Sequence, residues 1–469
     1  MADKTSVKFC EIKEAYIYSV DGEKTTVTNS IAGFAYFEDI NKPFVSAVAI
    51  IADSGQNFIG TLPIQGGEKF EIKFEDVLQE QYTYEFVIHK VTGRKFTDKQ
   101  QQYILGLISP EAVINEGVRI SEVLEGSPDQ IVKKILEEYL ETDKAVFTET
   151  CKYKIKFFPD GKKAHVVIEQ IAPKAVPQSS EVNGSEANKG ESSTSGKSSL
   201  PKNTKKASGS AGYLFFENRD GFHFKSVDYY YSDGSDSFGG EGPVETYEVR
   251  IAGEPNSDEN RTSISSYNFT GEIDLFDQMR RGVYSTYMVY YNFSTGSYEE
   301  YTYNYADSFS NQAHLGSQEK LGKIQKQLSE NPTRIVSAIL DHETWFSGEG
   351  SGSNEEKDGG DGSNPFPDYQ KQYMAQAFAR YYMMDNQKLE ITIPGNLELK
   401  VGDKIKVMLP NMVTGEERKN QKYDEENSGT YLISKIGHNI DIINSSAESQ
   451  IELIRDTYGM KEYTSNVKS

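Results

Sequence analysis

The fold of this chain is decided by the stretch Ser428-Gly429-Thr430-Tyr431-Leu432-Ile433-Ser434-Lys435-Ile436-Gly437-His438. A second run follows it, Ser449-Gln450-Ile451-Glu452-Leu453-Ile454-Arg455-Asp456, and Gly459 comes shortly afterwards. In these runs apolar and polar side chains largely alternate, as they do in a half-buried β-strand, where successive side chains point to opposite faces. The two runs therefore predict an antiparallel hairpin, and we interpret it as the closing hairpin of a β-barrel.

The apolar face of the first predicted strand carries His438 as well as aliphatic residues. The face comprises Leu432, Ile436, Ile440 and Ile442, and it faces away from Lys435, Asn439 and Asp441. A histidine on such a face is more often hydrogen-bonded inside a core than bound to a metal, and no second ligand residue stands nearby. We therefore expect His438, like Arg455 and Asp456, to be architectural.

The remaining pattern is also mainly β. Residues 1–109 contain short apolar runs separated by Gly, Asn, Asp and Pro, which predicts a sandwich or barrel of short strands. The predicted strands cover residues 15–20, 24–29, 33–37, 45–52, 58–62, 69–74, 84–91 and 103–108. Near the C-terminus, the runs 389–393, 397–401 and 404–409 join the closing hairpin in a second unit. We detect no sequence repeat between the two units.

Helices are predicted between these units. Ser127 is a good N-cap, Pro128 suits the first helical position and Gln130 completes a capping box. Residues 317–328 also read as a helix, whereas residues 331–345 are ambiguous between helix and strand. A last stripe at helical spacing consists of Tyr369, Tyr373, Ala377, Tyr381 and Met384.

The predicted fold class is therefore mainly β (α+β), with two small tube-like antiparallel β-barrels flanking a mixed α/β middle region. Segments rich in Ser, Gly and charged residues cannot bury enough surface to offset their ordering entropy, which predicts flexible inserts. The predicted divisions are a first barrel at 1–109, a helical and strand segment at 110–173, a flexible insert at 174–211, a Tyr-rich β and helical region at 212–346, a flexible linker at 347–365, a helix plus second barrel at 366–459, and a tail at 460–469.

The charge of the chain limits its partners. The 469 residues carry a formal net charge of −21, and only 36% of them are hydrophobic. Such a chain repels nucleic acid, because affinity for phosphate needs basic patches. Cys10 and Cys151 are the only cysteines, which excludes a disulfide framework and a cysteine-rich zinc site. We see no signal core and no apolar run that could span a bilayer, so we expect a protein made in the cytosol.

None of the candidate catalytic, phosphate-binding or metal-binding motifs is complete. His342-Glu343 begins like a zinc-protease motif, but Phe346 stands where the second histidine is needed. The glycines around 348–352 lack the Lys-Ser/Thr of a phosphate loop, and the acidic run 358–362 lacks calcium-loop spacing. The six histidines are scattered. We therefore expect no catalytic, cofactor-binding or metal-binding residues and no enzymatic activity.

Several motifs, taken in order, resemble the central baseplate hub proteins of T4-like contractile-tailed bacteriophages, a family shared with contractile injection machines. The motifs are 63–68, 102–105, Ser109-Pro110-Glu111 with Asn115 and Arg119, 212–226, 393–396, Gly402-Asp403 and 428–459. Each motif alone is weak, but their order spans nearly the whole chain. The inserts at 174–211 and 347–365 depart from the family pattern.

The resemblance implies a homotrimer in the virion tail baseplate, assembled in the host cytoplasm. Two tube-like units in each of three chains would give a ring of six, joining a sixfold tail tube to a threefold spike. Its partners would be tail tube or tube-initiator proteins, the spike protein and baseplate wedge proteins, with DNA passing through the channel without specific binding and with no membrane contact. Two alternatives stay open: a tail-associated cell-wall hydrolase, and a receptor- or glycan-binding module using the tyrosines near 287–305.

Overall fold

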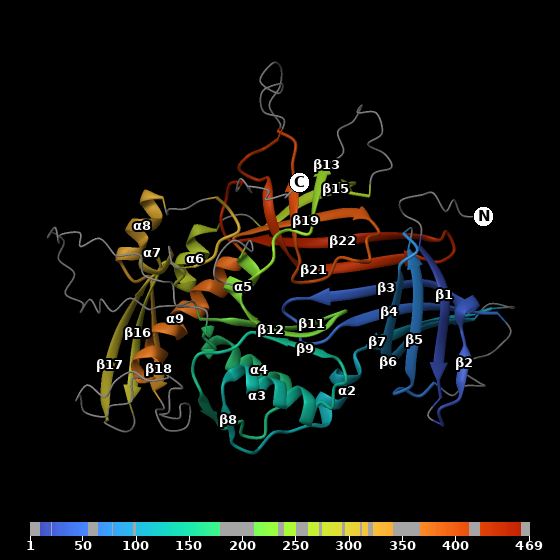
Figure 1. Cartoon of the computed structure of the whole chain (residues 1–469), viewed down its shortest axis with the longest axis horizontal. Coiled ribbons are helices and arrows are strands. Elements are labelled where there is room, and N and C mark those ends of the chain that lie inside the picture. Colours follow the sequence, from blue (N-terminus) through green and yellow to red (C-terminus); the bar gives the residue numbers. More distant parts are fainter. Residues whose placement is uncertain are drawn as a thin grey trace, which may run out of the picture.

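The computed structural model covers the whole chain (Figure 1). It describes residues 10–19, 21–54, 64–76, 78–96, 100–178, 211–232, 239–249, 261–271, 274–292, 296–309, 312–317, 322–340, 366–411 and 423–460. The predicted strand 58–62, the linker 347–365, the tail from 461 onward and most of the insert predicted at 174–211 lie outside the described residues. The first five residues of that insert, 174–178, are described, and they include the buried side chains of Ala175 and Val176.

The fold is mainly β, as the sequence predicts, and most described strands join one large sheet. The first β unit of this sheet comprises β1 (Cys10–Tyr18), β2 (Lys24–Thr26), β3 (Ile31–Asp39), β4 (Ser46–Asp53), β5 (Lys69–Asp76), β6 (Gln81–Phe96) and β7 (Gln101–Ile108). The second β unit comprises β13 (Glu245–Val249), β14 (Ser263–Ile264), β15 (Ser266–Gly271), β19 (Gln387–Pro394), β20 (Lys404–Met408), β21 (Gly429–Asp441) and β22 (Ser446–Arg455).

The predicted closing hairpin is present, as β21 and β22, but it does more than close the second unit. The first half of β21 pairs with β20, and its second half, from Lys435 to Asp441, pairs with β3 of the first unit. Strands β15, β19, β22, β21, β3 and β4 therefore follow one another across the view (Figure 1). The prediction of a half-buried strand holds from Lys435 onward, whereas residues 429–434 are buried on both faces.

This pairing changes the description of the two predicted barrels. The strands of both units belong to a single sheet of fourteen strands in the order β14-β13-β20-β21-β3-β4-β7-β6-β5-β1-β2, with β22, β19 and β15 branching from β21. Among the described strands, no ladder joins the first and last strands of either unit. Each unit instead folds its part of the sheet around its own apolar cluster, one containing Phe34, Phe74 and Phe86 and the other Ile405, Tyr431 and Leu453.

The two units repeat one strand order without a recognisable sequence repeat. In the first unit the order β5-β6-β7-β4-β3 is antiparallel throughout, and in the second unit β20-β21-β22-β19-β15 is antiparallel throughout. The β6–β7 ladder has β-bulges between Ile88 and Lys90 and between Thr92 and Lys95, and the β21–β22 ladder has one, between Ile433 and Lys435. The first bulge of β6 and the bulge of β21 lie at matching positions, so β6 corresponds to β21, and by strand order β3 corresponds to β15.

Helices and two small sheets fill the middle of the chain. The helices are α2 (Pro110–Gly117), α3 (Pro128–Lys134), α4 (Ala164–Ile171), α5 (Val227–Tyr231), α6 (Leu275–Arg281), α7 (Tyr305–Ser308), α8 (Lys323–Glu330) and α9 (Phe366–Met384). One sheet joins β9 (Ala145–Thr148), β11 (Tyr213–Asn218) and β12 (Gly221–Ser226), and the other joins β16 (Ser285–Asn292), β17 (Ser297–Asn304) and β18 (Arg334–Leu340). A short pair, β8 (Leu124–Gly126) and β10 (Ile155–Phe157), completes the middle region.

Several local predictions can be compared with these elements. The capping box at Ser127 and Gln130 is present at the start of α3. The ambiguous segment 331–345 contains the strand β18, and the helix predicted at 317–328 begins only at Lys323. The strand predicted at 397–401 is wrong: this segment is a loop. Its apolar side chains, Leu397, Leu399 and Val401, alternate because they are buried from the loop, not because they belong to a ladder.

Candidate functional site

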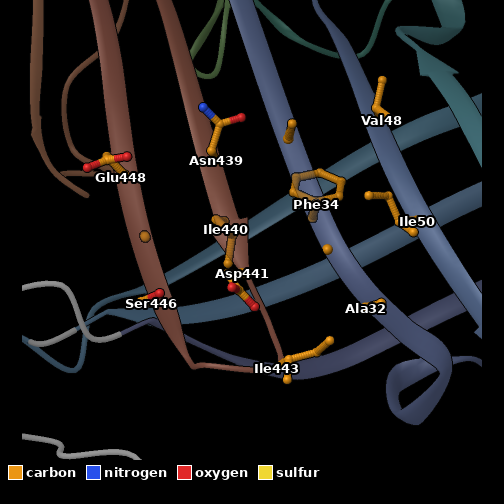
Figure 2. Close-up of a pocket in the computed structure, with 13 residues that line it drawn as sticks. Ala32, Phe34, Val48, Ile50, Asn439, Ile440, Asp441, Ile443, Ser446 and Glu448 are labelled. Atoms are coloured by element: carbon orange, nitrogen blue, oxygen red, sulfur yellow. The ribbon is translucent and has the colours of Figure 1, made fainter.

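The junction between the two β units contains a hollow of about 600 Å³ (Figure 2). It is lined by side chains and backbone of β3, β4, β21, β22 and the turn between the last two strands. Its lining includes the small residues Gly33 and Ala35 of β3 and the larger side chains of Ile50 and Ile443. The Ile443 side chain is 78% exposed.

The chemistry of this hollow suits contact rather than catalysis. Its ionisable lining residues are Asp441 and Glu448. The Asp441 carboxylate accepts hydrogen bonds from the Asn444 backbone N–H at 3.1 Å and the Asn444 side-chain amide at 2.7 Å, so it holds its own turn. These hydrogen bonds from Asn444 lower the pKa of Asp441. A carboxylate committed to its turn and kept ionised is a poor general acid.

His438 lies inside the junction and not on its surface. Its Nδ1 atom is 2.8 Å from Ser449 Oγ, its Nε2 atom is 3.3 Å from the Leu399 carbonyl oxygen, and its ring stacks on Tyr36 of β3. Burial lowers the pKa of His438 to about 4, so the imidazole is neutral near pH 7. The structure therefore places His438 between the two units, where it joins three segments.

A buried carboxylate on β3 ties the same junction to the middle region. Glu38 Oε1 accepts hydrogen bonds from the Tyr36 hydroxyl and the Arg219 backbone N–H, both at 2.7 Å, and Oε2 accepts one from the Val401 N–H at 2.7 Å. Burial raises the pKa of Glu38 to about 7. The sequence offers one signal for Glu38 that our interpretation missed: it continues the inward face of Phe34 and Tyr36 at a period of two.

A second buried cluster joins the first unit to the middle region. Lys144 Nζ donates to Glu111 at 2.7 Å, to Glu217 at 2.5 Å and to Ser109 Oγ at 2.8 Å. Glu217 also accepts the Val45 backbone N–H at 3.0 Å. Burial raises the pKa of Glu217 to about 7, against the lowering effect of the Lys144 charge. Ser109 and Glu111 belong to a motif that carries the family resemblance, and here they anchor the exit from β7.

A third cluster lies at the end of β22 and is fully buried. Arg380 of α9 donates to Asp228 of α5 at 2.7 Å, and its other terminal nitrogen lies 3.6 Å from Asp456. Asp456 accepts from His314 Nδ1 at 2.6 Å and from the Leu315 backbone N–H at 3.1 Å. Burial disfavours the charged form of Arg380, but the carboxylates of Asp228 and Asp456 raise its pKa. This cluster joins four segments that are far apart in the sequence.

Arg455 completes the polar lining of the second unit. Its guanidinium donates twice to Gln387 Oε1, at 2.7 and 3.1 Å, and to the Ser428 carbonyl oxygen at 3.1 Å, and it lies over the Tyr431 ring. The predicted motifs at 393–396 are held similarly. The Asn396 amide donates to the Tyr247 hydroxyl at 2.9 Å and its carbonyl accepts from Arg261 at 2.6 Å. These motif residues hold strand ends and turns together.

The tyrosine-rich segment divides between two faces of one sheet. Tyr290, Tyr303 and Tyr305 are buried against a cluster that includes α9, whereas Tyr298 is 71% exposed. Most of the predicted stripe is therefore strand and helix packing. Tyr291 and Tyr298 remain in contact on the other face, with ring centroids 5.1 Å apart.

The described residues contain no group of three or more His, Cys, Asp or Glu side chains arranged to hold a metal ion. None of the helices in the described part of the chain is both long and apolar enough to cross a membrane. Cys10 and Cys151 are free and buried. The His342-Glu343, glycine and acidic motifs all fall at 341–365 and lie outside the described residues.

No protein-family model matches the sequence, and no curated protein matches it. The structure is similar to the tail protein from Neisseria meningitidis MC58, with a TM-score of 0.50 over 94% of this chain and 96% of that chain, at 10% identity. It is also similar to the 43 kDa tail protein of prophage MuSo2 from Shewanella oneidensis, with a TM-score of 0.46, coverage of 95% and 98%, and 8% identity. The first similarity shows a shared fold across nearly the whole chain, and at this identity it shows the fold alone.

Proposed function

We propose that this chain is a structural component of a phage tail baseplate or of a related contractile injection machine. More specifically, it acts as a trimeric central hub that joins a sixfold tail tube to a threefold spike and lines the channel. The observation that carries this proposal is the edge-to-edge fusion of two β units with one strand order through β21 and β3. The fold shared with a tail protein supports it.

The fusion of the two β units explains how one ring can contact both a sixfold and a threefold partner. A closed ring of three identical chains has threefold symmetry, as cyclic oligomers do. Because each chain contributes two units of the same strand order, the ring presents six similar units to a sixfold partner. The second units and the middle regions attached to them each occur three times in this ring. A spike with threefold symmetry contacts these parts. In the proposed hub, tail tube or tube-initiator proteins contact one side, the spike the other, and wedge proteins the outside.

The proposed hub performs no catalysis and carries no cofactor. Its task is to keep a joint closed while DNA or another cargo passes, and the net charge of −21 disfavours adhesion of nucleic acid. The buried clusters around Glu38, Lys144 and Arg380 support this role, because they tie each β unit to the middle region at several points.

Sedimentation of the purified full-length chain tests the proposal. We expect one species with the mass of three chains at micromolar concentration. A chain that stays monomeric at every concentration, with its spike partner present, would contradict it. So would a stable twofold dimer, because a dimer provides four units and cannot match a sixfold tube.

A further inference from the structure

The second half of β6 has an open edge where the second half of β21 has a partner. In both strands, one edge is paired along its length by the hairpin neighbour, β7 or β22. On the other edge, the first half of each strand pairs with β5 or β20. The corresponding backbone bonds also match: Gly67 N–H donates to Ile88 and Gly402 N–H donates to Ile433. Beyond this point β21 continues against β3 along this edge, whereas the same edge of β6 has no ladder in the described part of the chain.

The matching open edge lies on β15. By strand order β15 corresponds to β3, since each pairs antiparallel with the next strand of its own unit, β19 or β4. The second edge of β3 is taken by β21, whereas β15 pairs with no other described strand. One chain therefore contains one closed junction and the two open halves of a second junction of the same kind. The two halves belong to different units, β6 to the first and β15 to the second (Figure 1).

We infer that the open edge of β6 in one copy of this chain pairs antiparallel with the open edge of β15 in a second copy, repeating the β21–β3 junction between chains. The contact is head-to-tail, so every copy uses one edge of each kind and the assembly can close into a ring. The number of copies in the ring rests on the proposed function. The strand pairing itself rests on the internal repeat.

The register of the closed junction predicts the register of the open one. In the closed junction Asn439 lies opposite Ala35 and Ile440 lies opposite Phe34. Through the ladders of each unit, and beyond the second bulge of β6, these positions correspond to Lys95 opposite Asn268 and to Phe96 opposite Tyr267. Ile440 and Phe34 are buried, whereas Phe96 is 68% exposed in the single chain. An exposed phenylalanine on an open strand edge is explained if Tyr267 of the neighbouring copy covers it.

Charge also favours a second copy at this edge. The open half of β6 carries Lys90, Arg94 and Lys95 and no acidic residue, in a chain that is strongly acidic overall. Beside Asn268, on the same face of the second unit, stands Glu390 of β19. The inferred register brings Lys95 of one copy close to Glu390 of the next, and this pair has the signs of Lys435 and Asp39 in the closed junction. Complementary charges fix register in such contacts.

Paired cysteines test the inference in the full-length chain, because facing residues of an antiparallel pair lie within disulfide distance. The test variant is Lys95→Cys with Asn268→Cys, and its matched control is Ala35→Cys with Asn439→Cys across the closed junction. We expect the test variant to give covalent species of two and three chains after oxidation, and the control to give only an internal cross-link. Each single cysteine variant should give almost no covalent oligomer.

Five outcomes separate this inference from the proposed function. Cross-linked species that stop at three chains support both. Cross-linked ladders longer than three chains support the strand pairing and contradict the trimeric hub. Trimers without cross-links contradict the strand pairing but not the trimeric hub. Cross-linking of the single variant Lys95→Cys would show that β6 contacts β6 of another copy, which also contradicts the strand pairing. A chain that is monomeric and never cross-links overturns both.

A second variant separates assembly from folding. Phe96→Ser removes the exposed ring from the open edge and should lower assembly at least tenfold while leaving the melting temperature of the single chain unchanged. The matched change Ile440→Ser acts at the corresponding buried position of the closed junction and should destabilise the chain itself. If Phe96→Ser assembles as the unmodified chain does, the inferred edge contact is wrong.

Discussion

The buried charged groups of the first β unit are carboxylates, such as Glu38 and Asp76, whereas the second β unit also buries the basic residues Arg455 and His438. In the first unit, Phe34 packs against Phe74, Tyr84 and Phe86, and the outer face of β1, β5 and the first half of β6 carries charges in surface pairs such as Lys69–Glu85. In the second unit, Arg455, Asp456 and His438 are all buried and hydrogen-bonded.

The difference follows from the neighbours of each unit rather than from strand order, which the two units share. The middle region packs over the second unit, and Arg380 of α9 lies between Asp456 and Asp228 of α5. Buried polar groups must be paired to be tolerated, so they favour one docking arrangement over others. The outer face of β1, β5 and the first half of β6 instead carries exposed charges. We therefore expect polar substitutions to have large effects in the second unit and small ones on the outer face of the first.

The largest effect is expected at Asp456. Asp456→Asn removes one charge from the buried cluster with Arg380 and His314, and breaking a buried pair costs roughly 3–5 kcal/mol. We expect a lower free energy of unfolding by that amount in urea titrations followed by circular dichroism. A loss below about 1 kcal/mol would show that the cluster does not hold the second unit in place.

A smaller effect is expected at the turn before Asn396. A Cβ atom at Gly395 would lie against the Ala447 side chain and 2.8 Å from the Ala447 carbonyl oxygen, so the hairpin must shift. Gly395→Ala should cost about 1–3 kcal/mol, as overpacking does. Gly117→Ala is the control, because a Cβ there meets no atom within 4 Å. Equal midpoints for the two variants in the same denaturant would contradict the close approach.

Glu38 makes the free energy of unfolding depend on pH, and the expected change per pH unit is smaller than the effects above. Burial raises the pKa of Glu38 from 4.5 to about 7, so between these values the folded chain binds more protons than the unfolded chain. Stability from this group therefore falls as pH rises through this window, by at most about 1.4 kcal/mol per pH unit. Glu38→Gln should flatten that part of the slope.

The measurement for Glu38 is the difference in free energy of unfolding between the unmodified chain and Glu38→Gln at pH 5, 6 and 7. The glutamine also disturbs hydrogen bonds, but that cost is constant, and only the titration changes the difference with pH. A difference that does not vary with pH would contradict a raised pKa. Glu85→Gln, at an exposed position, serves as the control.

The smallest effect is expected on the outer face of the first unit. Lys69 and Glu85 form a 2.8 Å ion pair in which both side chains are about half exposed. Exposed pairs contribute roughly 0.2–1 kcal/mol and are screened by salt. Glu85→Gln should therefore change the unfolding midpoint little, and not at all in high salt. A loss comparable to that of Asp456→Asn would remove the distinction between the two units.

Local sequence rules predicted some elements because the decisive residues are neighbours in the chain. The hairpin at 428–456 follows from alternation within each strand, and the start of α3 follows from Ser127, Pro128 and Gln130. The loop at 397–401 shows the limit of alternation, because the same pattern arises when a loop buries every second side chain. The strand β15 was missed for a related reason, since its partner β19 lies more than a hundred residues away.

The buried charges and the internal repeat could not be predicted from the sequence alone. Arg380 meets Asp228 across 152 positions, and Glu38 meets Val401 across 363, so no local window contains both partners. The repeat lies in the order of backbone pairing, which tolerates different side chains, since Asn439 of β21 corresponds to Lys95 of β6. The strand order that the two β units share can be recognised only from the hydrogen-bonded strand pairs of the structure.

In the proposed hub, three copies of this chain build a ring of six β units. Class averages of the purified full-length chain in electron micrographs test this arrangement. We expect a closed ring with a central hole, six lobes and threefold symmetry when viewed along its axis. Isolated single chains in the presence of the spike protein, or rings with twofold or fourfold symmetry, would contradict it.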